Sequence, residues 1–244
     1  MKCDRDIDKK EKVMYFMMPL HMHIDYGFGA TAEKFKESAD ILSVSESAKD
    51  LIMPINYLRR HTIELYLKSL IYVLHRKFNV PFSKSGSLEK PKIKVSGKEY
   101  ELEKMHDIRV LTMYFIEQHN KLIPCFFDIG IGEIEKDILD RINKINSIDS
   151  KSTFFRYPKT EDHIQDMRKS SVREKSTEAL INSMNKKNGK YVKALLLLDD
   201  DDNIVNSFDI NVEVLPDLHQ NLIYLCDYFY NLHAAYRFGI CNGM

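Results

Sequence analysis

The chain has 244 residues, with 36 basic and 36 acidic side chains and a formal net charge of zero. This balance excludes a whole-protein basic field for nucleic acid, though not a local basic patch. The four cysteines have no Cys-x-x-Cys spacing, which indicates reduced thiols in a cytosolic protein and disfavours a zinc site. No apolar run approaches the ~20 residues of a membrane span, and the charged N-terminus lacks the apolar core of a signal peptide.

The N-terminal segment combines charge with a short histidine pattern. Residues 1–12 are charged, and we expect them to be frayed. The side chains of His21, His23 and Asp25 could present three ligands on one side of an extended strand. Two neighbouring histidines before a glycine-rich turn are more often incidental, so we predict no metal site here. A helix is then expected over residues 31–50, with Ala32, Phe35, Ala39 and Leu42 on one face.

The next helix, expected from about Pro54 to Leu74, carries polar residues on an apolar body. At about 100° per residue, His61, Glu64 and Lys68 fall within one third of its circumference. A helix that is apolar on two sides is usually the buried centre of a bundle. Polar groups buried there are costly unless they satisfy one another or a ligand. We therefore predict that this trio is buried, near Arg156, and marks a site.

The rest of the chain alternates between helical and hairpin patterns. Hairpins are expected near residues 84–103 and 190–214, and helices from His106-Asp107, over 134–148 and from Pro216 onward. The polar residues 159–190 predict either a weak helix from Ser171 or a mobile flap. Because strands do not alternate with helices, a parallel sheet is disfavoured and an antiparallel helical bundle fits best. We expect a single domain over residues 1–244.

The polar residues admit a catalytic and a structural interpretation. A Glu beside a Lys and an Arg would be held ionised, and a His beside them could shuttle protons. The alternative is a buried ion network that fixes the register of the helices. The acidic run Asp199–Asp202 lacks the Gly and the distal Glu of a calcium loop, which predicts a solvated hairpin tip.

These residues also carry a resemblance to a known family. A helix reading H-x-x-E-L-x-L-K, a later H-D at a helix start and the run F-R-Y-P are similar to HEPN-like proteins of prokaryotic defence and toxin systems. The resemblance spans residues 31–158 and the last helix. It implies an antiparallel helical bundle that dimerises. In active members, an R-x(4–6)-H motif at the dimer cleft cleaves RNA without a metal.

Arg156 and His163 have six residues between them and fit that spacing. The resemblance assigns Arg156 to the phosphate and His163 to acid or base catalysis on attack by the 2′-OH. The chain departs from the pattern in two ways. Tyr157 follows the arginine, where a small polar residue is common, and His163 lies in a polar segment away from the start of the final helix.

Together these observations predict a mostly α, HEPN-like antiparallel helical bundle that is cytoplasmic and forms a homodimer. The leading function is a metal-independent endoribonuclease or toxin-type effector in antiviral defence or a toxin–antitoxin system. It would need no cofactor, act on RNA and meet an antitoxin or defence partner protein. The alternative is a non-catalytic HEPN-like module that binds nucleic acid, nucleotide or a partner protein. The expected binding or structural polar network consists of His61, Glu64, Lys68, His106, Asp149 and Tyr157.

Overall fold

The computed structural model describes residues 17–87, 90–186, 193–210, 212–241 and 243. The predicted frayed segment 1–12 lies outside the described residues. The chain divides into two compact units. Unit 1 comprises Met1–Arg156 and Leu218–Met244, and unit 2 comprises Tyr157–Asp217. Each unit is described by itself below.

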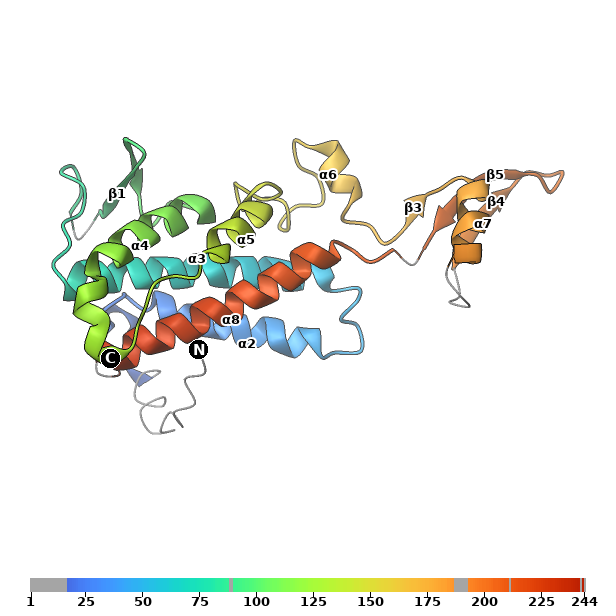
Figure 1. Cartoon of the computed structure of the whole chain (residues 1–244). Helices are drawn as coiled ribbons and strands as arrows, with labels where there is room; N and C mark the ends of the chain where they lie inside the picture. The colour runs from blue at the N-terminus through green and yellow to red at the C-terminus, as the bar shows by residue number, and fades with distance from the viewer. Residues whose placement is uncertain (1–16, 88–89, 187–192, 211, 242, 244) are drawn as a thin grey trace. The chain divides into compact units, whose positions relative to one another are not determined.

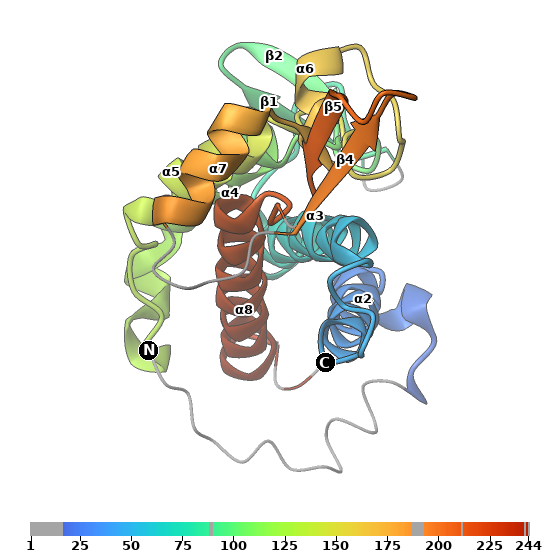
Figure 2. The ribbon, with the colours of Figure 1, turned by 90° about the vertical axis from the view of Figure 1, so that its right-hand side faces the viewer.

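Unit 1 is a bundle of long helices arranged around α3 (Ile52–Lys77). Helices α2 (Phe28–Ser43) and α4 (Ile108–Leu122) contact α3, and Figures 1 and 2 show α3 between them. Helix α5 (Asp137–Asn146) packs on α4, and α8 (Pro216–Gly239) packs on α3. The short 3-10 helices of unit 1 are η1 (Leu20–Met22) and η2 (Ile123–Ile129). The mostly α-helical prediction is confirmed.

Helix α3 is the buried centre that its sequence predicts. Both of its apolar sides are covered, and every residue from Ile55 to His75 is buried except Tyr57, Leu58 and His61, which are half-buried. The Tyr66 ring, for example, packs against the rings of Tyr230 and His233 in α8. None of the helices in the described part of the chain is long and apolar enough to cross a membrane.

Local hydrogen bonds set the helix ends. The Asp107 carboxylate accepts hydrogen bonds from the backbone amides of Arg109 and Val110, so the H-D pair opens α4 as an N-cap. Helix α2 ends at Ser43, earlier than the predicted Asp50. The Ser45 hydroxyl donates to the carbonyl of Leu42, and this local bond competes with continuation of the helix.

The first predicted hairpin is present. Strands β1 (Lys92–Val95) and β2 (Lys98–Glu101) pair antiparallel around Ser96-Gly97. Both turn residues have positive φ, 48° and 83°, as a two-residue hairpin turn requires. The hairpin packs on α4 through β1.

Unit 2 is a small three-stranded sheet with short helices. The second predicted hairpin consists of β4 (Ala194–Leu198) and β5 (Ile204–Asp209), which pair antiparallel. A two-residue strand, β3 (Arg173–Glu174), pairs with the other side of β5, so the strand order is β3-β5-β4. The hairpin expected as an insertion in one domain thus belongs to a unit of its own. The helices of this unit are α6 (His163–Met167) and α7 (Thr177–Lys186), which begins six residues after the predicted Ser171.

Candidate functional site

A buried ionic clasp, made of Arg60, Glu64, Lys68 and Asp149, lies inside unit 1. The Glu64 carboxylate accepts a hydrogen bond of 2.6 Å from Nη1 of Arg60 and one of 3.0 Å from Nζ of Lys68. These three residues follow one another at intervals of four on α3, so their side chains share one face. All four members are almost completely inaccessible to solvent.

Asp149 joins the clasp from the loop after α5. Its Oδ2 lies 3.3 Å from Nε of Arg60, while its Oδ1 accepts the backbone amides of Thr153 and Phe154. Arg60 also donates to the carbonyl of His106 at the start of α4. Two cations therefore meet two carboxylates, and the clasp is close to electrically neutral. It ties α3 to the start of α4 and to the loop that leads to Arg156.

One edge of the clasp reaches the surface at His106. Its Nδ1 lies 2.9 Å from Oε1 of Glu64, and half of the imidazole side chain is exposed. Burial alone would raise the pKa of Glu64, but the charges of Lys68 and Arg60 and the hydrogen bonds from Lys68 and His106 hold this pKa below its ordinary value. Glu64 is therefore a paired carboxylate at neutral pH. This arrangement favours the structural interpretation over a general base.

The expected trio is changed in one member, because Arg60 takes the place of His61. The His61 ring packs edge-on against Phe35 and stacks on Tyr57, and its buried Nδ1 has no hydrogen-bond partner among the described residues. Burial lowers the pKa of His61, so the ring is neutral at pH 7. Arg60 lies four residues before Glu64 and has the reach to bind Asp149 as well. Its four-residue spacing from Glu64 already indicated that Arg60 shares the helix face of Glu64 and Lys68, but the predicted trio did not include it.

The proposed catalytic pair is split between the units. Arg156 is the last residue of this part of unit 1; its exposed guanidinium lies 5.5 Å from the centre of the Tyr57 ring. It is close enough to His61 to contribute to lowering that residue's pKa. Tyr157 and His163 belong to unit 2 and are exposed, with His163 at the first position of α6. The structure thus brings Arg156 near His61, whereas His163 belongs to the other unit.

In the segment His21–Asp25, it is Asp25 that stabilises the start of α2. The Asp25 carboxylate accepts the backbone amides of Gly27 and Gly29 and the hydroxyl of Ser69, and it lies 3.8 Å from Nε2 of His233. Burial would raise its pKa, but His233, Ser69 and Gly29 lower it below its ordinary value. His21 is exposed, and His23 is buried. Within the described ranges, no group of three His, Cys, Asp or Glu side chains could hold a metal ion.

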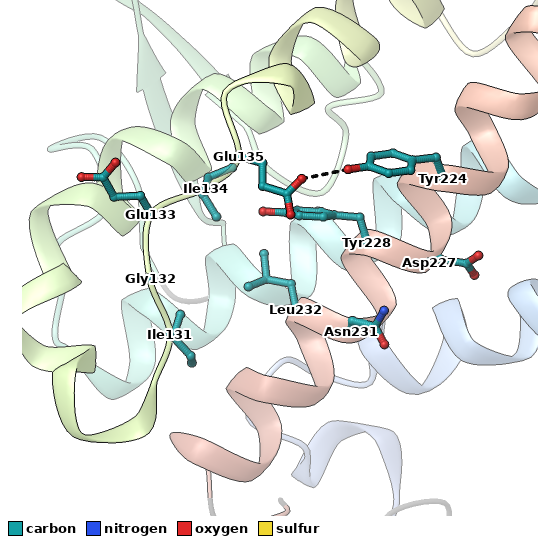
Figure 3. A pocket seen from close by; sticks show the side chains of 10 residues that line it. All are labelled: Ile131, Gly132, Glu133, Ile134, Glu135, Tyr224, Asp227, Tyr228, Asn231 and Leu232. Carbon is teal, nitrogen blue, oxygen red and sulfur yellow. Dashed lines mark hydrogen bonds between the residues drawn. The ribbon is translucent and has the colours of Figure 1, made fainter. Parts of the chain in front are cut away.

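A cavity of about 350 Å³ lies between the segment Ile131–Glu135 and α8 (Figure 3). The Tyr224 hydroxyl donates a 2.8 Å hydrogen bond to Glu135 across its mouth, and the Tyr228 ring forms part of its wall. The guanidinium of Arg141 covers the Tyr224 ring at 4.0 Å. This cavity was not among the sites predicted from the sequence. The four-residue spacing of the two tyrosines was a signal, but nothing local shows that residues 131–135 lie opposite them.

The lining of this cavity restricts what it could bind. It contains three carboxylates and no lysine or arginine: Glu133, Glu135 and Asp227. Asp227 is already paired with Lys36 at 3.0 Å. A phosphate group would meet negative charge here, and the lining itself has no cation to compensate it. The cavity is therefore a poor site for a nucleotide.

Unit 2 has the largest concentration of exposed apolar side chains in the described part of the chain. In that part, its buried apolar side chains are Leu180 and Leu215. Each of the four leucines of β4 is about half exposed, between 44% and 53%. Further exposed apolar residues of unit 2 are Ile164, Met167, Val172, Ile181, Ile204, Val205 and Ile210.

The fold and these sites define a two-unit protein. One unit is a helical bundle stabilised by a neutral buried clasp, and the other is a small sheet unit with an exposed apolar surface. No family model, no curated protein and no solved structure matches this chain.

Proposed function

We propose that this protein is a non-catalytic HEPN-like binding module that engages another protein chain through unit 2. The observation that carries the proposal is the exposed leucine strand β4 in a unit whose described residues include only two buried large apolar side chains, Leu180 and Leu215. The resemblance to HEPN-like proteins implies that the module would belong to a prokaryotic defence or toxin system. Its partner would then be an antitoxin, a defence protein or a second copy.

Much of the apolar surface of unit 2 is in contact with water. A small sheet is stable when one of its faces is packed, and fully burying a leucine is worth about 1.5–3 kcal/mol. Contiguous exposed apolar patches of this kind mark interaction surfaces. Leu195 and Leu197 point to the same side of β4, because they are two residues apart in a strand. A partner that covers them would supply the apolar contact that unit 2 lacks.

The other binding alternatives receive less support from the geometry. The clasp has no spare charge, since its two carboxylates already bind its two cations. The cavity beside α8 presents carboxylates rather than cations. Neither feature suits the phosphates of a nucleotide or a nucleic acid. A protein partner is therefore the better-supported ligand class.

Site-specific photo-crosslinking tests this proposal on the full chain. A benzophenone amino acid at Leu197 should join the protein to one defined polypeptide in the cells that express it, and mass spectrometry should map the junction on both chains. The matched control is Ile41 on α2, which is 68% exposed and lies in unit 1. No crosslink from Leu197, or crosslinks equal to those from Ile41, would contradict the proposal.

The second candidate is the metal-independent endoribonuclease, and the surroundings of Arg156 favour it. An exposed guanidinium can bind a phosphate, and the neutral imidazole of His61 beside it could accept a proton. His163 remains the histidine that the family spacing assigns. The test is the product: cleavage of this type leaves a 2′,3′-cyclic phosphate, whereas a binding module leaves RNA intact.

A further inference from the structure

Strand β4 lies at the edge of the described sheet, and the direction of its backbone groups follows from its pairing with β5. In the order β3-β5-β4, its only neighbour in the described sheet is β5. The backbone amide of Ile210 donates to the carbonyl of Lys193, so these two residues form a hydrogen-bonded pair of the antiparallel ladder. Because antiparallel hydrogen-bonded pairs alternate, Leu195 and Leu197 direct their backbone groups toward β5. The N–H and C=O groups of Ala194 and Leu196 consequently face the open edge.

We propose that β4 pairs antiparallel with β4 of a second copy of this chain, on a two-fold axis that passes through Leu196. This inference rests on the proposed function and names its partner. With the axis at Leu196, Ala194 lies opposite Leu198 of the second copy. Outward-facing backbone groups then meet outward-facing groups along the pair, which gives a continuous six-stranded sheet.

The charges at the two ends of β4 favour this orientation. Lys193 precedes the strand, and the acidic tip Asp199–Asp202 follows it. In the antiparallel pair, Lys193 lies opposite Asp199 of the second copy, and the same contact recurs across the axis. A parallel pair would place the two acidic tips together, and like charges directly opposite are destabilising. The strand itself carries no charge, so apolar residues lie opposite apolar residues along the pair.

The remaining edge of the sheet explains why the association stops at two copies. On the far side of β5, β3 pairs with only Phe208 and Asp209. The register between β4 and β5 also shifts at Leu197/Leu198, which disturbs the hairpin near its tip. Short edge strands and bulges both discourage further pairing. The two-fold pair covers the β4 edge of the described sheet, and its small size makes the dimer a reversible one.

Sedimentation of the full chain from about 1 μM to about 1 mM tests the proposal. The parent should move from monomer to dimer across this range. Leu196→Pro removes the outward N–H and leaves the bonds to β5 intact, so the dissociation constant should rise on the order of 10-fold or more. Leu196→Val, similar in volume and with its N–H retained, should stay within about 3-fold of the parent. Circular dichroism and amide exchange in β5 verify that both variants are folded.

A charge reversal checks the orientation. Lys193→Glu should weaken the dimer on the order of 10-fold at low salt and less at high salt, because it faces Asp199 of the second copy. Lys90→Glu, an exposed change of the same charge in unit 1, should leave the dimer unchanged. A parent that stays monomeric throughout, or a Leu196→Pro variant that dimerises like the parent, overturns the inference. If the crosslink from Leu197 meanwhile identifies a different protein, the proposed function stands while self-pairing fails.

Discussion

Arg60 and Glu64, one helical turn apart on α3, form a 2.6 Å ion pair whose two side chains are at most 1% exposed. Taking two charges out of water is costly, so the pair is stable only while both partners remain. Asp149 and Lys68 complete the balance. The clasp therefore depends on each of its members more than on any single bond.

Removing one charge from the clasp should destabilise unit 1 strongly. Glu64→Ala leaves Arg60 and Lys68 buried with one carboxylate between them, and we expect a loss of about 3 kcal/mol in the free energy of unfolding. Urea unfolding followed by circular dichroism measures this loss. The control is Glu117→Ala, which removes an exposed carboxylate paired with Lys121 and should cost less than about 1 kcal/mol. Equal losses for the two variants would show that the clasp is not a structural element.

The clasp also shows how far the sequence could lead. Periodicity was enough to predict that α3 is central and that Glu64 and Lys68 are buried on it. The four-residue spacing from Glu64 also pointed to Arg60, but not to its second partner, Asp149, which lies 89 positions away. Contacts at such separations leave no trace in a local pattern. The sequence shows the residues of the clasp but does not show which of them pair across long separations.

The second unit shows a different limit. The β4–β5 hairpin was predictable because two apolar runs flank an acidic turn. Strand β3 has two residues and is defined only by its pairing with β5, so no local preference could indicate it. The polar composition of residues 159–190 likewise left open whether this segment would be a helix or a flap.

Stability should fall as the pH drops from 7.5 to 5.5. Burial lowers the pKa of His119, although a hydrogen bond to the carbonyl of Gly132 opposes this shift. As the pH falls below about 6.5, the ordinary pKa of histidine, His119 is protonated in the unfolded chain while it stays neutral in the folded protein. The unfolded state then binds more protons, so the stabilisation that is present above this pH is lost. This histidine alone should account for about 1 kcal/mol at pH 5.5.

His119→Gln provides the measurement for this pH effect. The amide can still hydrogen-bond near Tyr236 and Gly132 but does not titrate. Urea unfolding of the parent and of the variant at both pH values should show a pH-dependent loss smaller by about 1 kcal/mol in the variant. His75, His219 and His61 also have lowered pKa values, so a residual loss of the same sign should remain. An undiminished loss in the variant would remove His119 from this account.

Gly29 should not tolerate a side chain. A Cβ at this position would lie 2.2 Å from Nε2 of His233 and 2.8 Å from Oδ2 of Asp25. Gly29→Ala should therefore displace α8 from the start of α2 and cost about 2 kcal/mol or more. Gly132→Ala is the matched control, because a Cβ there would meet nothing within 4 Å, and it should change stability by less than about 0.5 kcal/mol. Thermal unfolding of both variants decides the comparison.

The last prediction separates the catalytic candidate from the binding module. If the protein cleaves RNA by the mechanism that the family resemblance implies, cleavage should persist in EDTA. Arg156→Ala should slow it by roughly 10²-fold or more, because the guanidinium would no longer hold the phosphate. His163→Ala should have an effect of the same size if this residue transfers the proton. Both side chains are exposed, so the variants should unfold at the same urea concentration as the parent.

His61→Ala is the discriminating variant for that experiment. Its ring is the histidine that the structure places near Arg156, whereas His163 lies in the other unit. A loss of cleavage with His61→Ala but not with His163→Ala would keep the reaction and reassign its acid or base. If Arg156→Ala instead unfolds the protein, the F-R-Y-P segment has a structural role and stabilises α3 through the contact of Arg156 with Tyr57. Purified parent protein that leaves RNA intact would remove the catalytic candidate and leave the binding module.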